Sequence, residues 1–392
     1  MPTSVERPAP QPRWHFLDAL RAFLMLVGLP FHAARLFRGD LPALDTAAEF
    51  TSVWRMTTFF VVAGFFALLV AQRRGPWVWL RGRVVRLGVP LVFCVLVLNP
   101  WQSIMFWGED VALRRLTHSA WPWLHHAWFL LYLLIYCALF AAAFAVFRGL
   151  LTGGLGVLAR GVFASGWTLA GCALLGGLAA YAIHGLWLEF GVGDATRRAL
   201  THLLGIHVVS FGAGLLMAAG SNHADRIPTL ARGPVVVVAV LGTLWVLVEP
   251  APAESDAAKA AYTGVAMTAG LAWAALWMRW FARHCNRDTM VVRWLVSASL
   301  PVYLLHHVVA FGLGPVVADQ GWNPWVGFAV LTVLVCVIAF VGYEVANLTT
   351  PTRLLLSGDR SRGVSLYDVL RARREPPLPS GEPIVTHASR RP

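Results

Sequence analysis

Several ionisable side chains lie inside long apolar segments of this sequence, where they are candidates for a reactive site. The apolar segment 16–37 contains Asp18, Arg21 and His32. A charged residue at the centre of a membrane helix costs about 2.5–3.5 kcal/mol on insertion scales, so such residues are candidates for function. In a helix, residues eleven positions apart lie on nearly the same face, about 16 Å apart in height. Arg21 and His32 are therefore predicted to line one face, and Asp18, one turn before Arg21, can pair with it.

Three other apolar segments carry polar or ionisable residues to about the depth of His32. The residues predicted to gather there are Arg55, His126, Trp128, Tyr303, His306 and His307. A lone intramembrane histidine is more often hydrogen-bonded to a neighbouring helix, and an arginine near a helix end often snorkels to the interface. Those structural interpretations stay open for each residue alone. Histidines from three helices at one depth instead indicate a reactive site.

These side chains are suited to acyl transfer. A neutral imidazole can take the proton of an attacking alcohol or accept an acyl group itself. A nearby cation can bind a carboxylate or stabilise a developing oxyanion. The sequence contains no GxSxG, HExxH, Walker A or dinucleotide fingerprint, so it does not indicate ATP, NAD or another prosthetic group. Its five cysteines show no metal-ligand spacing, and no metal site is predicted.

These residues are predicted to lie on membrane helices. The chain has 57% hydrophobic and 13% charged residues and a mean hydropathy of +0.62, whereas a soluble domain carries about 25% charged residues. This composition excludes a cytosolic enzyme, a nucleic-acid-binding domain and a disordered protein. A hydrocarbon core needs about 20 apolar residues per helix. Ten segments qualify, and they predict an all-α, polytopic membrane helix bundle of about ten transmembrane helices: 16–37, 52–71, 87–107, 124–147, 163–187, 199–219, 233–249, 261–281, 295–318 and 325–348.

The distribution of positive charge predicts the orientation of this bundle. Of the 32 Lys and Arg residues, 23 lie on the side that carries both ends of the chain and 7 on the opposite side. Positive loops face the cytoplasm, so both termini are predicted to be cytoplasmic. The net charge of +12 is then a topology signal, and no nucleic-acid partner is expected. The predicted organisation is a cytoplasmic N-terminal segment 1–15, a transmembrane domain 16–350 and a basic cytoplasmic C-terminal tail 351–392.

Several motifs resemble those of the membrane-bound acyltransferase 3 family. Arg21, ten further residues and His32 resemble its Arg-x10-His signature, and segments 59–65, 83–90 and 126–130 continue the likeness in the same order. Within that family the chain is most similar to the glucans biosynthesis protein C subfamily, which succinylates osmoregulated periplasmic glucans. That likeness lies in segments 21–32, 54–56, 299–307, 343–344 and 354–358. It covers roughly residues 16–358, with no recognised motif between 148 and 259.

The resemblance implies a multi-pass enzyme of the bacterial inner membrane that transfers an acyl group from cytoplasmic acyl-CoA, here succinyl-CoA, to a hydroxyl of a periplasmic glucan. His32 would be the base or the acyl acceptor, and Arg21 and Asp18 would be the other members of the catalytic set. The other residues at the depth of His32 would bind substrate. Cytoplasmic arginines are candidate partners for the donor phosphates, with a purely topological role as the alternative: Arg81, Arg83 and Arg86. The expected partners are acyl-CoA, the glucan and the lipid bilayer, and a homo-oligomer is compatible with the sequence.

Two other functions are considered beside this one. The first is an acetyltransferase acting on lipopolysaccharide or exopolysaccharide, and the second is a transporter of a glycan or lipid precursor. Transporters commonly contain inverted repeats, and no such symmetry is visible in this sequence. Succinyl differs from acetyl by a carboxylate, which needs a cationic partner when buried, and Arg55 is the predicted partner. Glu344 lies near the predicted cytoplasmic end of segment 325–348 and is interpreted as a structural partner of Arg83 or Arg86.

Overall fold

A computed structural model describes residues 14–37, 40–118, 121–189, 206–220, 227–248 and 255–374, and every regular element in them is helical. Seven helical stretches among these residues are long and apolar enough to cross a membrane: His15–Phe37, Pro42–Arg74, Pro76–Trp107, His125–Val146, Gly166–Leu186, Met290–Ala318 and Pro324–Ala346. They coincide with seven of the ten predicted spans, which confirms the all-α, multi-span architecture. The other three coincide with the helices α12 (His207–Ala219), α15 (Gly233–Val248) and α16 (Asp256–His284), and for these the crossing stays a prediction. Residues 199–205 of the sixth span lie outside the described residues.

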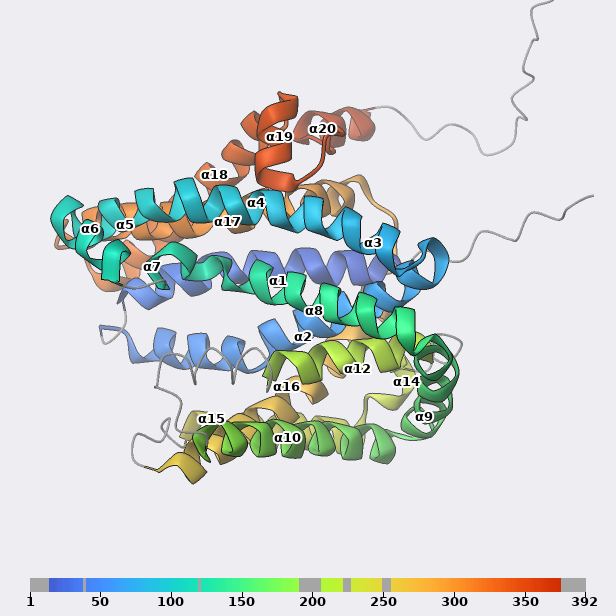
Figure 1. Ribbon diagram of the computed structural model, residues 1–392. Helices are drawn as coiled ribbons and strands as arrows, with labels where there is room; N and C mark the ends of the chain where they lie inside the picture. Colours follow the sequence, from blue (N-terminus) through green and yellow to red (C-terminus); the bar gives the residue numbers. More distant parts are fainter. Residues whose placement is uncertain are drawn as a thin grey trace, which may run out of the picture.

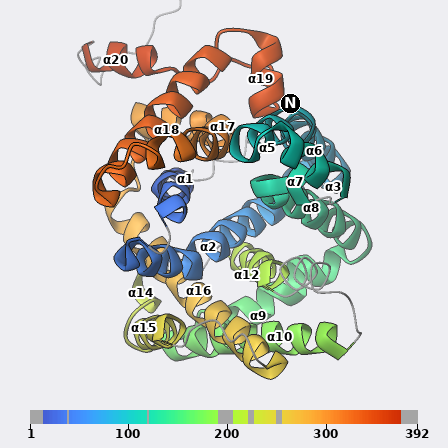
Figure 2. The same ribbon diagram turned by 90° about the vertical axis from the view of Figure 1, so that its left-hand side faces the viewer.

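The first helix occupies the middle of the bundle. It contacts four long helices, which surround it when the molecule is viewed along the helix axes (Figure 2): α2 (Pro42–Arg74), α16, α17 (Met290–Ala318) and α18 (Pro324–Ala346). Leu17, Leu20 and Leu24 of α1 (His15–Ala34) are buried in the main core. A helix that is hydrophobic on most of its faces is stable when it is enclosed by others. The polar residues of α1 are therefore held inside the protein.

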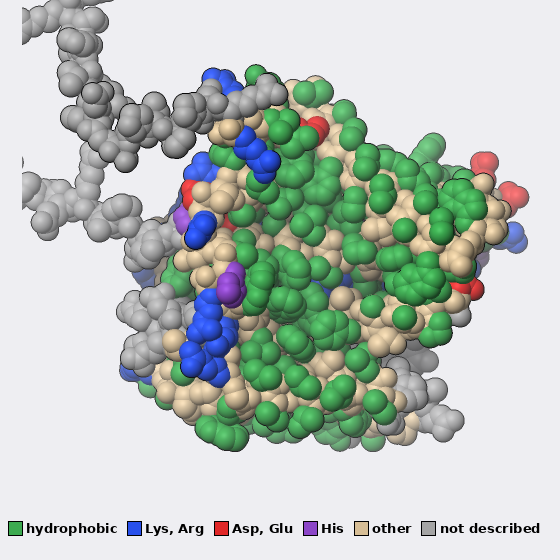
Figure 3. Space-filling view, turned by 180° about the vertical axis from the view of Figure 1, so that it is seen from behind, with side chains coloured by type: hydrophobic (Ala, Val, Ile, Leu, Met, Phe, Trp, Pro, Cys, Tyr) green, Lys and Arg blue, Asp and Glu red, His purple; other side chains and the backbone are tan. Residues whose placement is uncertain are grey.

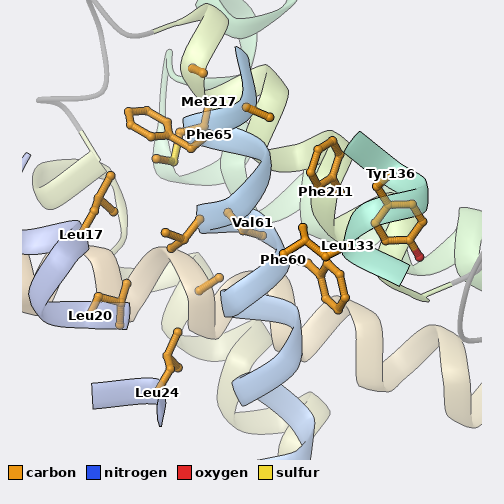
Figure 4. Packing of buried hydrophobic residues seen from close by; sticks show 14 of the residues in the cluster. Leu17, Leu20, Leu24, Phe60, Val61, Phe65, Leu133, Tyr136, Phe211 and Met217 are labelled. Carbon is orange, nitrogen blue, oxygen red and sulfur yellow. The ribbon is translucent and has the colours of Figure 1, made fainter. Parts of the chain in front are cut away.

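The second helix crosses α12 at backbone contact. A Cβ placed on Gly64 would lie 2.1 Å from the carbonyl oxygen of Phe211, and one on Gly214 would lie 2.0 Å from the carbonyl oxygen of Val61. Figure 4 shows Val61 and Phe211 where the two helices meet. Small residues allow membrane helices to approach closely and to gain dispersion contacts along their backbones. The two glycines thus fix how α2 lies against the rest of the bundle.

The third span is a helix with two π turns. Its parts are α3 (Pro76–Arg83), η2 (Val84–Gly88), α4 (Val89–Phe93), η3 (Cys94–Leu98) and α5 (Asn99–Trp107). A π turn inserts a residue into the helix and is frequent at functional sites. The second π turn directly precedes Asn99, which is fully buried although it is polar. The span therefore directs polar residues of α5 toward the interior.

A short connection leads from the third span to the fourth. It lies at the end of the bundle where α5 ends (Figure 1). The connection and span consist of α6 (Glu109–His118), α7 (Trp121–Leu124), η4 (His125–Ala127) and α8 (Trp128–Val146). His125 has a positive φ of 37°, a conformation that a non-glycine residue rarely adopts and that tends to occur at functional sites. Local strain therefore falls directly beside His126.

A second layer of helices lies away from α1. It contains α9 (Leu155–Val162), α10 (Gly166–Glu189), α14 (Ile227–Leu230) and α15, with α16 joining it to the inner helices. Figure 1 shows α10 and α15 at the far edge of this layer. The layer comes from the region between 148 and 259 in which no motif was recognised. It supports α2 and α16 and forms one side of the bundle.

Part of the segment predicted as a C-terminal tail folds back onto the bundle. Two helices, α19 (Thr350–Ser357) and α20 (Leu366–Arg374), follow α18 and contact α4, η2 and α17. Gly358 has a φ of 64°, and a Cβ there would lie 2.4 Å from the backbone of Arg86. Asn347 donates from Nδ2 to the carbonyl of Gly363 at 2.9 Å. The chain is thus anchored up to about residue 374, and residues 375–392 lie outside the described residues.

The pairing predicted for Glu344 is wrong. Its Oε1 accepts hydrogen bonds from Trp294 Nε1 at 2.7 Å and from the backbone N–H of Leu366 at 2.9 Å. Arg86, one of the two expected partners, instead donates to Asp359. The reason is that the C-terminal segment brings its own backbone donors and its own carboxylate to this end of the bundle. Glu344 therefore ties α17 and α18 to the start of α20.

The surface is that of a multi-pass membrane protein. Figure 3 shows a broad hydrophobic face with Lys and Arg side chains gathered along one edge. Large apolar side chains that are at least half exposed occur on the outer spans, among them Val92, Leu96, Trp101, Leu175 and Leu178. Exposed apolar patches of this extent are unfavourable in water but not in lipid.

Candidate active site

Four histidines from three separate parts of the chain meet in the interior. His32 of α1 lies with its ring centroid 5.0 Å from that of His306 and 4.7 Å from that of His307, both on α17. His126 of η4 stacks on His307 at 4.2 Å and lies 5.8 Å from His306. We call these four residues the histidine cluster. The structure thus brings together the histidines that the sequence placed at one depth.

The partners of the cluster determine which ring nitrogens are free. His306 donates from Nδ1 to the carbonyl oxygen of Val302 at 3.1 Å, since a carbonyl can only accept. Its Nε2 is buried with no hydrogen-bond partner among the described residues, as are Nδ1 of His32 and both ring nitrogens of His126. Buried polar atoms are normally paired, so unpaired ones suggest a place for a substrate or water. Tyr303, one turn before His306, donates its hydroxyl to the carbonyl of His126.

Arg55 lies against α1 immediately beside His32. Its guanidinium carbon is 4.0 Å from the centre of the Phe31 ring, and its Nη1 occupies the space next to Gly28, where a Cβ would lie 3.0 Å away. Gly28 is one turn before His32, so the missing side chain makes room for the cation. None of the ion pairs in the described residues includes Arg55, and its Nε has no hydrogen-bond partner there. The site therefore holds a cation without a counter-ion from these residues.

Trp128 lines the same space but packs against a histidine outside the cluster. Its ring stacks on His207 at 5.3 Å, and Phe60 stacks on His207 at 4.5 Å. His207 is therefore held between two aromatic rings from α8 and α2. Sequence reasoning did not single out His207, because one histidine within the predicted span 199–219 carries no spacing signal.

Three buried polar residues of α5 were also not predicted as site residues. Asn99, Gln102 and Ser103 are at most 1% exposed. Their spacing of three and four residues places them on one face of the helix. This spacing, in an otherwise apolar span, was the signal that could have found them. They contact the residues that carry the histidine cluster, as described below.

The other end of α1 carries a second charged group. Arg21 forms an ion pair with Asp18, with 3.9 Å between Nη1 and Oδ1. Arg83 and Arg86 lie in the same part of the cavity described below, whereas Arg81 is exposed and does not line it. The C-terminal segment adds Arg353 and Arg362, which sequence reasoning did not include, because only the tertiary fold brings them here.

Asp359 is the carboxylate of this second group. It accepts hydrogen bonds from Arg86 and from the backbone N–H of Ser361 at 3.0 Å. Burial by itself raises the pKa of Asp359, but the hydrogen bonds from Ser361 and Arg86 outweigh it and hold the pKa at about 2. Asp359 is therefore ionised at neutral pH, and its pairing with Arg86 is present above its ordinary pKa and is lost as pH falls through about 2.

One cavity of about 860 Å³ connects the two groups. It is lined by Arg21, Arg83, Arg86 and Asp359 at one end and by His32, Arg55, His126 and His306 further along. Beyond the histidine cluster it extends to Glu49 and Tyr262. Its volume lies in the range of pockets that bind cofactor-sized molecules. In the described part of the chain, no group of three or more His, Cys, Asp or Glu side chains is arranged to hold a metal ion.

Comparison with known proteins gives a consistent result. A family described as an acyltransferase domain matches residues 14–344. The chain is 24% identical over 386 residues to a protein named glucans biosynthesis protein C from Escherichia coli O139:H28, covering 90% of this chain and 96% of that one. It is 25% identical over 370 residues to the protein of that name from Salmonella typhimurium LT2, covering 89% and 96%. No solved structure matches the chain significantly. The match over most of its length shows that this chain belongs to the acyltransferase 3 family of membrane acyltransferases.

Proposed function

We propose that this protein transfers a succinyl group from cytoplasmic succinyl-CoA to a hydroxyl of a periplasmic glucan, across the bacterial inner membrane. The observation that carries the proposal is the single cavity that joins an arginine-rich end to the histidine cluster. The names of the relatives from Escherichia coli and Salmonella support a role in glucan biosynthesis.

The arginine-rich end is suited to the nucleotide part of the donor. Arg21, Arg83 and Arg86 line the cavity there, and arginine forms charge-assisted hydrogen bonds to phosphate. Arg21 and His32 are eleven residues apart on α1, which is about 16 Å along a helix. This is on the order of the length of a pantetheine arm. A donor bound by its phosphates at this end would therefore present its thioester near His32.

The reaction assigned to the cluster is a balanced acyl transfer. The acceptor hydroxyl oxygen attacks the thioester carbonyl carbon while an imidazole of the cluster, assigned as His32, takes the hydroxyl proton. Arg55 lies where a cation can stabilise negative charge that develops beside His32. The C–S bond then breaks, an ester forms, and the thiolate of CoA takes the proton from the imidazolium. If His32 is instead acylated first, the same products follow in two steps.

Arg55 also supports the choice of succinyl over acetyl. It is a cation inside the bundle, its Nε has no hydrogen-bond partner among the described residues, and it lines the cavity with His32. A buried carboxylate needs such a partner, and the acetyl group has none to offer it. An acetyltransferase would leave this arginine without an anion in the site.

The proposal is tested with the purified full-length protein in lipid nanodiscs. Labelled succinyl-CoA and labelled acetyl-CoA are each supplied with a β-glucan acceptor, and both thioester cleavage and label on the glucan are measured. We expect succinyl transfer to exceed acetyl transfer. An acid quench during turnover shows whether label becomes bound to the protein, which separates acyl-His from direct transfer. If neither donor supports transfer, the enzymatic proposal is overturned. A preference for acetyl-CoA would overturn the donor assignment.

A further inference from the structure

The polar face of α5 contacts two of the three parts of the chain that form the histidine cluster. Gln102 is 1% exposed, and its Oε1 lies 2.8 Å from Nδ1 of His307. Asn99 donates from Nδ2 to the carbonyl oxygens of Trp123 at 2.6 Å and Leu124 at 3.0 Å, directly before His125.

Ser103 completes this face. Its hydroxyl lies 2.9 Å from Nε2 of His125, the residue with positive φ that precedes His126. These contacts lie within about one turn of α5, and they reach α17 on one side and α7 and η4 on the other. Neither the three α5 residues nor His307 belong to the cavity lining, which contains His32, His126 and His306, so Gln102 and His307 contact the lining histidines from behind. That placement is expected of residues that position others and do not touch the substrate.

The bond from Gln102 fixes the form of the His307 ring. An amide oxygen can only accept, so Nδ1 of His307 carries the proton and, in the neutral ring, Nε2 keeps the lone pair. The ring that is oriented in this way stacks on His126 at 4.2 Å and meets His32 edge-on at 4.7 Å. A hydrogen bond to one imidazole nitrogen is the usual means of selecting which nitrogen does chemistry.

We propose that Gln102 is a positioning residue of this acyltransferase: it holds His307 in the Nδ1–H tautomer, so that the basic Nε2 takes part in the proton transfers of the histidine cluster. The inference rests on the function proposed above. Gln102 acts through His307 and does not touch the substrate. The groups that face His307 are His32 from α1, His125 and His126 from η4, and His306 on its own helix.

The test compares Gln102→Leu and Gln102→Glu with the intact full-length protein in nanodiscs. Leucine removes the acceptor, and we expect kcat to fall about 10–100-fold, as is typical when a residue that orients an imidazole is lost, with an unchanged KM for the acyl-CoA donor. Glutamate restores an acceptor and adds a charge that favours the imidazolium. We therefore expect it to recover most of the activity at higher pH, with the acidic limb of the kcat profile moved up by about one unit or more.

Thr263→Val provides a matched control. Thr263 hydrogen-bonds Nδ1 of His184 at 2.9 Å, which is an interhelical bond of the same kind outside the cluster. We expect this variant to keep the wild-type kcat and pH profile. If Gln102→Leu keeps the wild-type kcat, or if Thr263→Val loses as much activity, the positioning role is wrong.

A measurement independent of turnover separates this inference from the proposed function. Solid-state NMR of protein labelled with ¹⁵N-histidine reports which ring nitrogen is protonated, and His307→Gln assigns the signal. We expect His307 to be the Nδ1–H tautomer in the wild type and to lose that preference in Gln102→Leu. A wild-type Nε2–H tautomer would overturn the inference even in an active enzyme. Wild-type protein that transfers no acyl group would instead contradict the proposed function, while the tautomer result still decides the role of Gln102.

Discussion

At the scale of single residues, the site depends on His32 and on what surrounds it. The ring of His32 lies about 5 Å from two other imidazoles. The guanidinium of Arg55, from α2, lies beside Gly28, which is one turn before His32 on α1. Imidazoles packed this closely cannot all be charged without strong repulsion. Such a group is therefore suited to holding and moving one proton, which is what acyl transfer to a hydroxyl needs.

Replacement of His32 tests its assignment as base or acyl acceptor. We expect His32→Ala to lower succinyl transfer about 10²–10⁴-fold, the usual contribution of a positioned base, while membrane insertion and melting temperature stay close to wild type. Transfer assays and thermal unfolding of the purified variant measure the two effects. His15→Ala, which changes a histidine at the start of the same helix, is the control. Near-normal transfer by His32→Ala would remove this residue from the mechanism.

Replacement of Arg55 tests the choice of donor. If Arg55 binds the distal carboxylate of the succinyl group, Arg55→Leu leaves that charge unpaired. The free energy of the transition state with succinyl-CoA should then rise by about 2–5 kcal/mol, and kcat/KM should fall accordingly. Acetyl-CoA lacks the carboxylate, so its use should fall much less. Side-by-side kinetics with both donors give the answer. Equal losses for the two donors would contradict binding of the succinyl carboxylate by Arg55 and would leave it the stabilisation of developing charge or the packing of α2 against α1.

At the scale of helices, the bundle depends on glycine contacts that keep α2 in place. Gly64 and Gly214 let α2 and α12 meet at backbone distance, and Gly270 of α16 would place a Cβ 2.5 Å from the carbonyl oxygen of Val53. Since α2 carries Arg55, these contacts determine where the cation lies. Close helix approach through small residues is thus part of how the site is built.

Substitution at this crossing should cost stability. Gly64→Ala forces the two backbones apart, and we expect it to destabilise the protein by about 1–3 kcal/mol, as overpacking does. Gly212→Ala on α12 is the control, because a Cβ there meets nothing within 4 Å. Thermal unfolding in the same detergent compares the two. Equal melting temperatures for both variants would show that the crossing of α2 and α12 accepts an added methyl group without loss of stability.

At the scale of the whole molecule, the cavity passes from the end lined by the C-terminal segment to the histidine cluster and beyond it. The segment between Thr350 and Arg374 is attached at that first end, where Asp359 pairs with Arg86. The basic side chains gather along one edge of the hydrophobic face (Figure 3). If that edge is cytoplasmic, the donor and acceptor of the proposed reaction would reach His32 from opposite sides of the membrane.

Cysteine labelling tests this orientation. Trp322, between α17 and α18, is 47% exposed, and Tyr367 on α20 is 68% exposed. Each is changed to cysteine in a background whose five native cysteines are replaced by alanine. In intact spheroplasts, a membrane-impermeant maleimide should label Trp322→Cys and not Tyr367→Cys, and after lysis it should label both. The reverse pattern would place the donor end outside and contradict the cytoplasmic location of the C-terminus.

Patterns within single segments were enough to predict the all-helical membrane architecture and the histidines that meet in the candidate site. Apolar runs of about 20 residues report helices because lipid leaves the backbone no other partner. Within one helix the spacing of Arg21 and His32 fixes their relative placement. The depth of His126 and His306 then followed from counting residues along each span. These are local properties, so the sequence contains them.

Most contacts between side chains of different helices could not be predicted from the segments alone, because they depend on how the helices pack. Glu344 was assigned to an arginine because charge alone suggested it, but the returning C-terminal segment supplies nearer partners. Arg81 has the same charge as Arg86, yet it faces away from the cavity because helix rotation separates them. Gln102 became part of the site through a contact with His307, 205 residues away. Rotation about each helix axis and the folding back of the chain depend on packing between segments, which the pattern within a single segment does not specify.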